Sequence, residues 1–287
     1  MRTVLVTGAS TGIGAATAHR LAGAGWHVLA GVRREQDGAL LRSGLAAGAS
    51  GAIEPIILDV TDPAAITALA QRLGDGPLDG LVNNAGVVVA APMESVPLDD
   101  IRRQFEVNVV GQVAVTQAVL PHLRRATGRI VFMGSVGGRV GQPFVGPYCA
   151  SKHAIEAIAD ALRMELRPWG IQVVVIEPGS VRTPLWEKST GAAMGAMERM
   201  PARVHELYGP AIARMEIVSR RQERLGVRPD VVAVRVEQAL TAERPPVRRL
   251  VGRDAAPLVI ARRLLGDRRF DTLLLRATGL PRAGGHR

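Results

Sequence analysis

Short apolar runs along the chain alternate with longer stretches in which apolar residues recur every three or four positions. The runs are rich in Val, Ile and Leu, which is typical of strands that are buried on both faces. They lie at residues 2–7, 26–32, 53–58, 79–82, 129–133, 171–176 and 248–252. The longer stretches predict helices at residues 15–24, 98–125, 148–167 and 229–242. This alternation predicts an α/β fold: a doubly wound parallel sheet of about seven strands with helices on both faces.

Two segments depart from this rhythm. Residues 185–228 contain Met194, Met197, Met200 and Met215, and methionine fills irregular apolar space, so we expect a small helical lid over an apolar substrate. A helical hairpin that only covers the core is the alternative. Residues 255–279 mix an apolar side with arginines and predict a helix with a solvated basic face, or else a membrane-surface or partner contact. We expect a single domain over residues 1–287, with residues 253–287 as a basic C-terminal helical extension.

Charge and composition narrow the function classes. The net charge is +10, but the eleven Arg and three Asp from Arg244 onward hold +8 of it, which leaves about +2 for the rest. Aromatic residues make up only 3%, so no stacking platform for nucleic acid is expected. Cys149 is the only cysteine and no signal segment precedes the first strand, which predicts a cytoplasmic location. We expect no metal site and no transmembrane segment.

A glycine-rich loop follows the first strand. Its residues Gly8, Ser10, Thr11, Gly12, Ile13 and Gly14 stand before the first helix with the spacing Gly-x3-Gly-x-Gly. Strand, glycine loop and helix form the dinucleotide-binding arrangement, in which the helix N-terminus faces the pyrophosphate. An ordinary tight turn is the alternative.

The ends of the next strands offer further cofactor contacts. Arg33 and Arg34 follow the second strand with no carboxylate before them, and guanidinium groups there favour NADP(H), with NAD(H) possible. Two solvated surface arginines are the alternative. Asp59 with Val60 ends the third strand and could accept from the adenine amino group or simply cap a turn. Asn84, Ala85 and Gly86 follow the fourth strand, where the backbone must approach a ribose.

The strongest chemical candidate is the pair Tyr148 and Lys152. Residues four apart lie on one helix face, and an ammonium beside a phenol favours the phenolate and lowers its pKa. Lys152 and Lys188 are the only lysines in an arginine-rich chain. Ser135 ends the fifth strand and is expected at the same sheet edge. Asn108, a polar residue in an apolar helix, either satisfies a buried carbonyl or bends the helix around a water.

Taken in order, these motifs resemble the short-chain dehydrogenase/reductase family over roughly residues 2–252. The matching segments are the glycine loop, Asp59, residues 83–86, Asn108, Ser135, Tyr148 with Lys152, and residues 178–183. The resemblance implies a Rossmann fold and a catalytic tetrad of Asn108, Ser135, Tyr148 and Lys152. Tyr148 would be the general acid or base and Ser135 would orient the substrate oxygen. Lys152 would hold the nicotinamide ribose and lower the tyrosine pKa, while Asn108 would position a water.

The resemblance also implies further contacts. Pro178, Gly179, Val181 and Thr183 would lie beside the nicotinamide, and Arg33 stands where NADP-preferring members carry a basic residue. The general character of the chain is similar to the hydroxysteroid and retinol dehydrogenase-like branch, so we expect an apolar ketone or alcohol, in keeping with apolar residues 87–91 and 194–200. Family members suggest a homodimer or homotetramer built on helices 98–125 and 148–167. The alternative function is a non-catalytic NADP(H)-binding sensor or regulatory protein.

Overall fold

The computed structural model describes residues 1–183 and 202–278 of the chain. One parallel sheet lies at its centre, with the strand order β3-β2-β1-β4-β5-β6-β7. The strands are β1 Thr3–Val6, β2 His27–Val32, β3 Ala52–Ile57, β4 Gly80–Asn83, β5 Arg129–Met133, β6 Gln172–Pro178 and β7 Arg248–Val251. This confirms the predicted doubly wound sheet, and the reversal of strand order beside β1 creates the crevice where such folds bind ligands.

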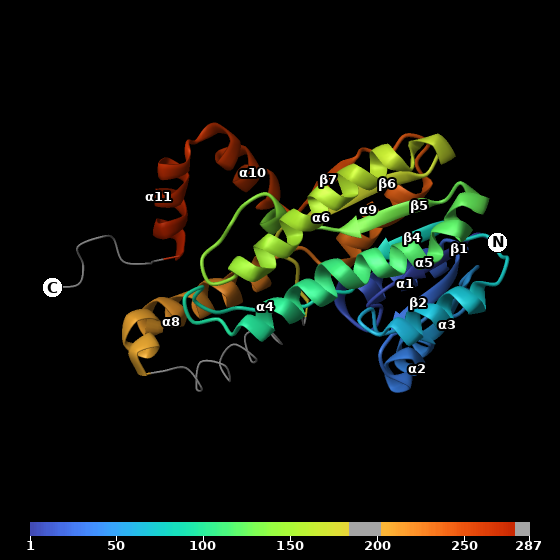
Figure 1. Ribbon diagram of the computed structural model, residues 1–287, viewed down its shortest axis with the longest axis horizontal. Helices are drawn as coiled ribbons and strands as arrows, with labels where there is room; N and C mark the ends of the chain where they lie inside the picture. Colours follow the sequence, from blue (N-terminus) through green and yellow to red (C-terminus); the bar gives the residue numbers. More distant parts are fainter. Residues whose placement is uncertain (184–201, 279–287) are drawn as a thin grey trace.

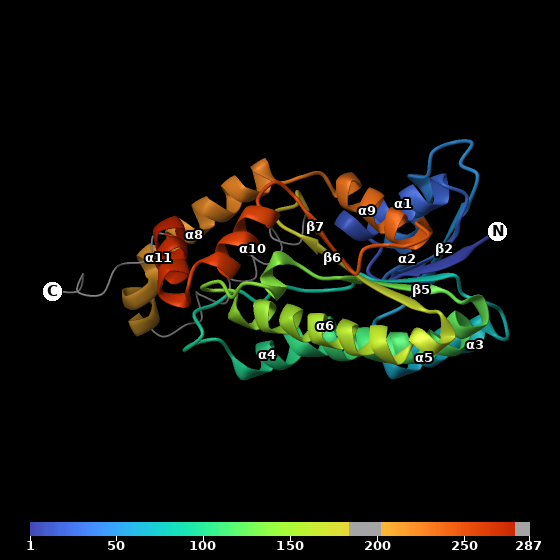
Figure 2. The ribbon, with the colours of Figure 1, turned by 90° about the horizontal axis from the view of Figure 1, so that it is seen from above.

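Helices cover both faces of the sheet (Figure 2). One face carries α1 Gly12–Gly23, α2 Glu35–Ser43 and α9 Pro229–Thr241, and the other carries α3 Pro63–Leu73, α5 Gly111–Ala126 and α6 Gly146–Glu165. Side chains along each strand alternate between the two layers, so Val4 and Val6 join one core cluster and Leu5 joins the other. Burial on both faces is the reason why the strands read as continuous apolar runs.

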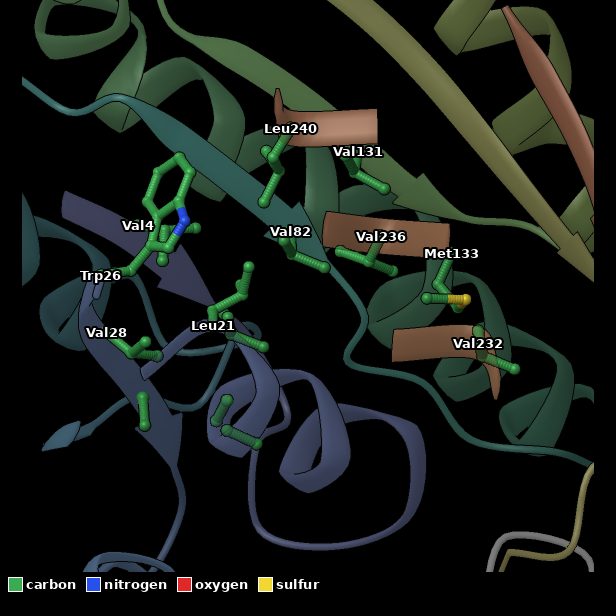
Figure 3. Packing of buried hydrophobic residues seen from close by; sticks show 14 of the residues in the cluster. Val4, Leu21, Trp26, Val28, Val82, Val131, Met133, Val232, Val236 and Leu240 are labelled. Atoms are coloured by element: carbon green, nitrogen blue, oxygen red, sulfur yellow. The ribbon is translucent and has the colours of Figure 1, made fainter. Parts of the chain in front are cut away.

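The packing of α1 against α9 fixes the element that follows the glycine loop. Leu21 of α1 lies in one cluster with Val232, Val236 and Leu240 of α9, over Val82 of the sheet (Figure 3). Each fully buried aliphatic side chain contributes about 1.5–3 kcal/mol. This packing holds the N-terminal end of α1 at the crevice.

Residues 98–125 form the predicted helical segment, but a π-helical turn lies within it. The segment consists of α4 Leu98–Phe105, a π-helical turn Glu106–Val110 and α5. Asn108 lies in the wide turn, fully buried, and its side chain bonds both backbone polar groups of Val87.

The C-terminal part gathers at the far end of the molecule from the N-terminus (Figure 1). It holds α8 Ala202–Leu225, α10 Ala255–Leu264 and α11 Asp267–Thr278. The prediction of one helix over residues 255–279 is wrong, because Leu265 adopts an extended conformation before Gly266 and the chain turns into α11. Much of the predicted lid, including Met194, Met197 and Met200, falls outside the described residues, as do residues 279–287.

Short 3-10 turns, Val136–Gly138 and Arg167–Trp169, complete the described elements. Within residues 1–183 and 202–278, none of the helices combines the length and apolarity that a membrane span requires.

Candidate active site

The glycine loop lies between β1 and α1 and brings its backbone to the crevice. Gly8 and Gly12 have φ angles of +63° and +59°, which glycine adopts without strain. A Cβ atom at Gly14 would lie 2.2 Å from the carbonyl oxygen of Gly8, so no larger residue fits there. Thr11, the N-cap residue of α1, makes no capping hydrogen bond with its side chain. The first-turn N–H groups of α1 therefore form an anion site.

Two polar side chains join the glycine loop to the end of β4. The hydroxyl oxygen of Thr7 accepts hydrogen bonds from the backbone N–H groups of Asn84 and Ala85, both at 3.0 Å. The side-chain amide of Asn84 donates to the carbonyl oxygens of Thr7 and Gly8, also at 3.0 Å. Asn84 thus holds the glycine loop in place as well as facing the crevice.

Three buried amide side chains hold the segment that follows β4. Gln104, Asn108 and Gln112 are spaced by four residues across α4, the π turn and α5, and all three are fully buried. Gln104 bonds Val87 and Val89, Asn108 bonds Val87, and Gln112 donates to the carbonyl oxygen of Ala85. The Asn108 amide also donates to the Ser151 hydroxyl at 3.2 Å. The prediction that Asn108 satisfies a buried carbonyl is confirmed, and its two companions were missed.

The arginines after β2 take different positions. Arg33 lines the crevice, whereas the Arg34 guanidinium binds both carboxylate oxygens of Asp37, at 2.9 and 3.0 Å. Arg34 is not among the residues that line the crevice, and its contact with the cofactor stays a prediction.

Asp59 has the predicted role in a turn, and its contact with the adenine amino group stays a prediction. Its carboxylate accepts from the backbone N–H and the hydroxyl of Thr61, at 2.9 and 2.7 Å, and the residue also lines the crevice. Burial raises the pKa of the Asp59 carboxyl, but the hydrogen bonds from Thr61 and the charge of Arg33 outweigh it and lower the pKa below its ordinary value. Asp59 is therefore a fixed carboxylate acceptor beside the crevice.

Ser135, Tyr148 and Lys152 come together where β5 ends and α6 begins. The Ser135 hydroxyl accepts from the backbone N–H of Gly137 at 3.0 Å and hydrogen-bonds with the Tyr148 side chain. The Lys152 ammonium donates to the carbonyl oxygen of Met133 at 2.7 Å and lies 5.8 Å from the Tyr148 ring centroid. A Cβ atom at Gly137 would lie 3.2 Å from the Tyr148 ring, a tight contact that glycine avoids.

Burial is the largest influence on the pKa values of Tyr148 and Lys152. It raises the pKa of Tyr148 to about 12, against the opposing hydrogen bond from Ser135, and lowers the pKa of Lys152 to about 8, against the charge of Glu156. The expected lowering of the tyrosine pKa by Lys152 is thus not found here. The ammonium is itself buried and is committed to the Met133 carbonyl. Tyr148 is therefore a neutral phenol at physiological pH, and Lys152 is mostly an ammonium.

One cleft of about 870 Å³ connects these groups. The residues predicted from sequence that line it are Gly8, Ser10, Thr11, Gly12, Ile13, Gly14, Arg33, Asp59, Val60, Asn84, Ala85, Gly86, Ser135, Tyr148, Lys152, Pro178, Gly179, Val181 and Thr183. Arg34 and Asn108 are not among the lining residues. The cleft also has an apolar wall, residues 87–91, and charged residues of the α4 region that the sequence reading missed, Asp100, Arg102, Arg103 and Glu106.

Comparison with known proteins settles the family. The short chain dehydrogenase family pattern matches residues 2–193. The chain belongs to the short chain dehydrogenase family. It is accordingly an oxidoreductase of the kind that acts on CH–OH groups.

Relatives of this short chain dehydrogenase extend over nearly the whole chain. It is 32% identical over 282 residues to an NADPH-dependent 3-dehydrocapnine reductase of Ornithobacterium rhinotracheale, covering 95% of this chain and 96% of that protein. It is 36% identical over 281 residues to retinol dehydrogenase 5 of Mus musculus, covering 94% and 87%. A short-chain dehydrogenase structure from Streptomyces avermitilis aligns with a TM-score of 0.74 and 28% identity, covering 97% of this chain and 95% of that one. The mouse relative belongs to the branch that the general character of the sequence resembles.

The cleft of this short chain dehydrogenase suits a dinucleotide that carries an extra phosphate. Gly14 lets the N-terminus of α1 pack closely on the Gly8 carbonyl, so the first-turn N–H groups at the cleft could bind a pyrophosphate. Arg33 supplies a guanidinium at the end of β2. Across the described ranges, His, Cys, Asp and Glu do not gather in threes that could hold a metal ion.

Proposed function

We propose that the protein is an NADP(H)-dependent oxidoreductase that interconverts an apolar ketone or aldehyde and the corresponding alcohol, with Tyr148 as the general acid or base. The observation that carries the proposal is the arrangement of Ser135, Tyr148 and Lys152 in the same cleft as the glycine loop. A dinucleotide on the loop and a substrate oxygen at the phenol would lie within one continuous site.

The protein's own groups supply proton transfer and orientation, while bound NADP(H) supplies or accepts the hydride. The Tyr148 phenol keeps its proton at neutral pH because burial raises its pKa to about 12, so it is ready to donate to an oxygen that gains negative charge. The Ser135 hydroxyl, fixed by Gly137, orients that oxygen.

Lys152 and Asn108 have supporting roles in this proposal. The Lys152 ammonium would bind the nicotinamide ribose from its place on the Met133 carbonyl. The side chain of Asn108 is committed to Val87 and Ser151, which supports a positioning role for it. Pro178, Gly179, Val181 and Thr183 line the cleft where the nicotinamide would lie.

Two observations support NADP(H) over NAD(H). Arg33 reaches the cleft directly after β2, where a 2′-phosphate would be bound. The first carboxylate after β2 is Glu35, the first residue of α2, so none precedes the two arginines. The relative from Ornithobacterium rhinotracheale is named as NADPH-dependent. NAD(H) remains the second candidate for the cofactor.

The walls of the cleft support an apolar substrate. Residues 87–91 are all Val or Ala and line it. Tyr208 of α8 packs edge to face against Phe144, with ring centroids 6.1 Å apart, on the loop that leads to Tyr148. This contact supports the proposed lid role of the α8 region beside the substrate end of the cleft.

An assembly through α4, α5 and α6 remains a prediction, as does the cytoplasmic location. Val110 and Met164, which are 49% and 62% exposed, are apolar residues that a homodimer or homotetramer would cover. A membrane contact through the basic C-terminal segment is a weaker expectation.

The proposal is tested by following NADPH and NADH oxidation in parallel over a panel of bulky apolar ketones and small polar ketones. We expect turnover of apolar ketones with NADPH, and a loss of about 100-fold or more in Tyr148→Phe, because positioned acid catalysis contributes at least that much. Cys149→Ser, one residue along and buried beside Tyr148, is the matched control and should retain turnover. NADPH binding without turnover of any carbonyl compound would favour the sensor function instead.

A further inference from the structure

Helix α6 carries an acidic continuation of the catalytic pair. Tyr148, Lys152, Glu156 and Asp160 follow one another at four-residue intervals, so they share one face of the helix. Glu156 is 7% exposed. A Cβ atom at Gly134 would lie 3.1 Å from a Glu156 carboxyl oxygen, and one at Gly138 would lie 3.2 Å from Glu156 Cγ. Glu156 therefore packs directly behind the backbone that carries Ser135.

A second buried acid, Glu177 of β6, meets Glu156. Glu177 is 1% exposed, and the two side chains hydrogen-bond to each other. Two carboxylates cannot do so, because both offer only acceptors. Among the described residues, Oε1 of Glu156 lacks a hydrogen-bond donor, whereas Oε1 of Glu177 lies 2.8 Å from Nε of Arg139. One proton between the two acids would give Oε1 of Glu156 its partner.

We propose that Glu156 and Glu177 share one proton, and that the negative charge of the pair holds Lys152 in its ammonium form. Glu156 is then a positioning residue for the reaction, since it acts through Lys152. The effect on catalysis rests on the proposed function, whereas the shared proton and the charge of Lys152 do not.

The charges around the pair suit a single net negative charge. Arg139 lies 2.8 Å from Glu177 through its Nε atom, and Arg248 donates to Glu156 at 2.9 Å and to Asp160 at 2.7 Å. Asp160 also accepts from Arg163 at 3.1 Å. A second cavity of about 510 Å³ is lined by Arg139, Glu177 and Arg248, together with Arg235 and Arg249.

The consequence for Lys152 follows from its burial. Burial lowers the pKa of Lys152 to about 8, and the charge of Glu156 is what opposes a further fall. Lys152 and Glu156 lie one helical turn apart on the same face of α6, and attraction between opposite charges is screened less in a buried site than in water. Loss of the Glu156 charge would leave Lys152 a neutral amine near physiological pH.

The scarcity of lysine makes a direct measurement possible. Lysine labelled with ¹⁵N or ¹³C gives signals from Lys152 and Lys188 alone, and the Lys188→Arg variant assigns them. We expect Glu156→Gln to lower the Lys152 pKa by about one unit or more, as removal of a close opposite charge does. Asp160→Asn is the matched control, because it lies one turn further and shares Arg248, and it should leave the Lys152 pKa unchanged.

Glu177→Gln keeps the proposal testable if Glu156→Gln does not fold. Its amide donates to the Glu156 carboxylate in place of the shared proton, so the Lys152 pKa should stay within a few tenths of a unit of the wild-type value. Equal Lys152 pKa values in Glu156→Gln and wild type, or a fall in Glu177→Gln of one unit or more, would overturn the proposal.

The fall of kcat/KM at alkaline pH, measured with NADPH, tests the effect on catalysis. This fall should begin at lower pH in Glu156→Gln but not in Asp160→Asn. The two proposals fail separately: absence of turnover in the wild-type protein would refute the proposed function, while the lysine titration would still test the role of Glu156.

Discussion

Replacing Thr7 by valine tests how the glycine loop is held to the end of β4. Valine has the shape of threonine but cannot accept a hydrogen bond, and the Thr7 side chain is fully buried. The Thr7 hydroxyl accepts from the backbone N–H groups of Asn84 and Ala85 and makes a longer contact of 3.4 Å to the Val82 carbonyl oxygen. The substitution therefore leaves two amide donors without their acceptor and creates no cavity.

The cost follows from those two donors. An unsatisfied buried donor costs about 1–3 kcal/mol. Asn84 and Ala85 are half-buried, so water can partly replace the lost acceptor and the lower part of the range applies. We expect the free energy of unfolding to fall by about 2–3 kcal/mol, which at an m-value of about 3 kcal/mol/M moves the urea midpoint down by about 0.7–1 M. NADPH binding should weaken as well, because the same bonds place residues 84–86 at the cleft.

Thr17→Val is the matched control for this experiment. Thr17 is equally buried, in α1, and its hydroxyl has no hydrogen-bond partner in the part of the chain that the structure describes. Removing an unsatisfied hydroxyl should leave stability unchanged or raise it by up to about 1 kcal/mol. Urea denaturation followed by circular dichroism compares the three proteins. Equal midpoints for the two variants would refute the reasoning, because burial alone would then govern the effect.

Three further predictions address the cofactor, pH and a helix cap. Arg33→Ala should raise KM for NADPH about 10-fold or more and leave KM for NADH unchanged, since a charged hydrogen bond contributes about 1.5–3 kcal/mol. The control is Arg34→Ala, whose guanidinium binds a neighbouring aspartate. Equal effects of the two substitutions would contradict the prediction. NADPH affinity, followed by fluorescence titration, should fall as pH rises through about 8, because Lys152 has its pKa lowered to that value and loses its proton there; a constant affinity up to about pH 10 would oppose a role for the ammonium. Asp62→Ala removes the N-cap acceptor of α3 and should lower the free energy of unfolding by about 1 kcal/mol, seen as a lower Tm.

The strands could be predicted from sequence because both faces of the sheet are covered. Burial on both sides makes each strand an apolar run, and β5 begins and ends at the predicted residues. The helical regions were less certain. The π turn around Asn108 depends on its bonds to Val87, which lies on another segment, and no local pattern records that contact. The break between α10 and α11 did have a signal, because Gly266 interrupts the apolar pattern.

The candidate site could also be predicted only in part. The glycine loop, Ser135 and Tyr148 could be placed at one edge because parallel strands deliver their carboxyl ends together. The pKa of Tyr148 could not be predicted, since it depends on burial by surrounding elements. Residues that act through partners were missed, although Glu156 stands four residues after Lys152, and that spacing was available in the sequence.

The contact between α1 and α9 has a consequence for synthesis of the chain. The two helices are neighbours in the fold, and Arg20 of α1 donates to Glu237 of α9 at 2.6 Å, yet α1 ends at Gly23 and α9 begins at Pro229. At ribosomal speeds of about 5–20 residues per second, roughly 10–40 s pass between the emergence of the two. During that time α1 can pack on β1 and β2, but the part of its apolar side that meets α9 has no native cover. The glycine loop is thus among the first residues to leave the ribosome and among the last to become functional, and nascent chains that stop before α9 should not retain the cofactor.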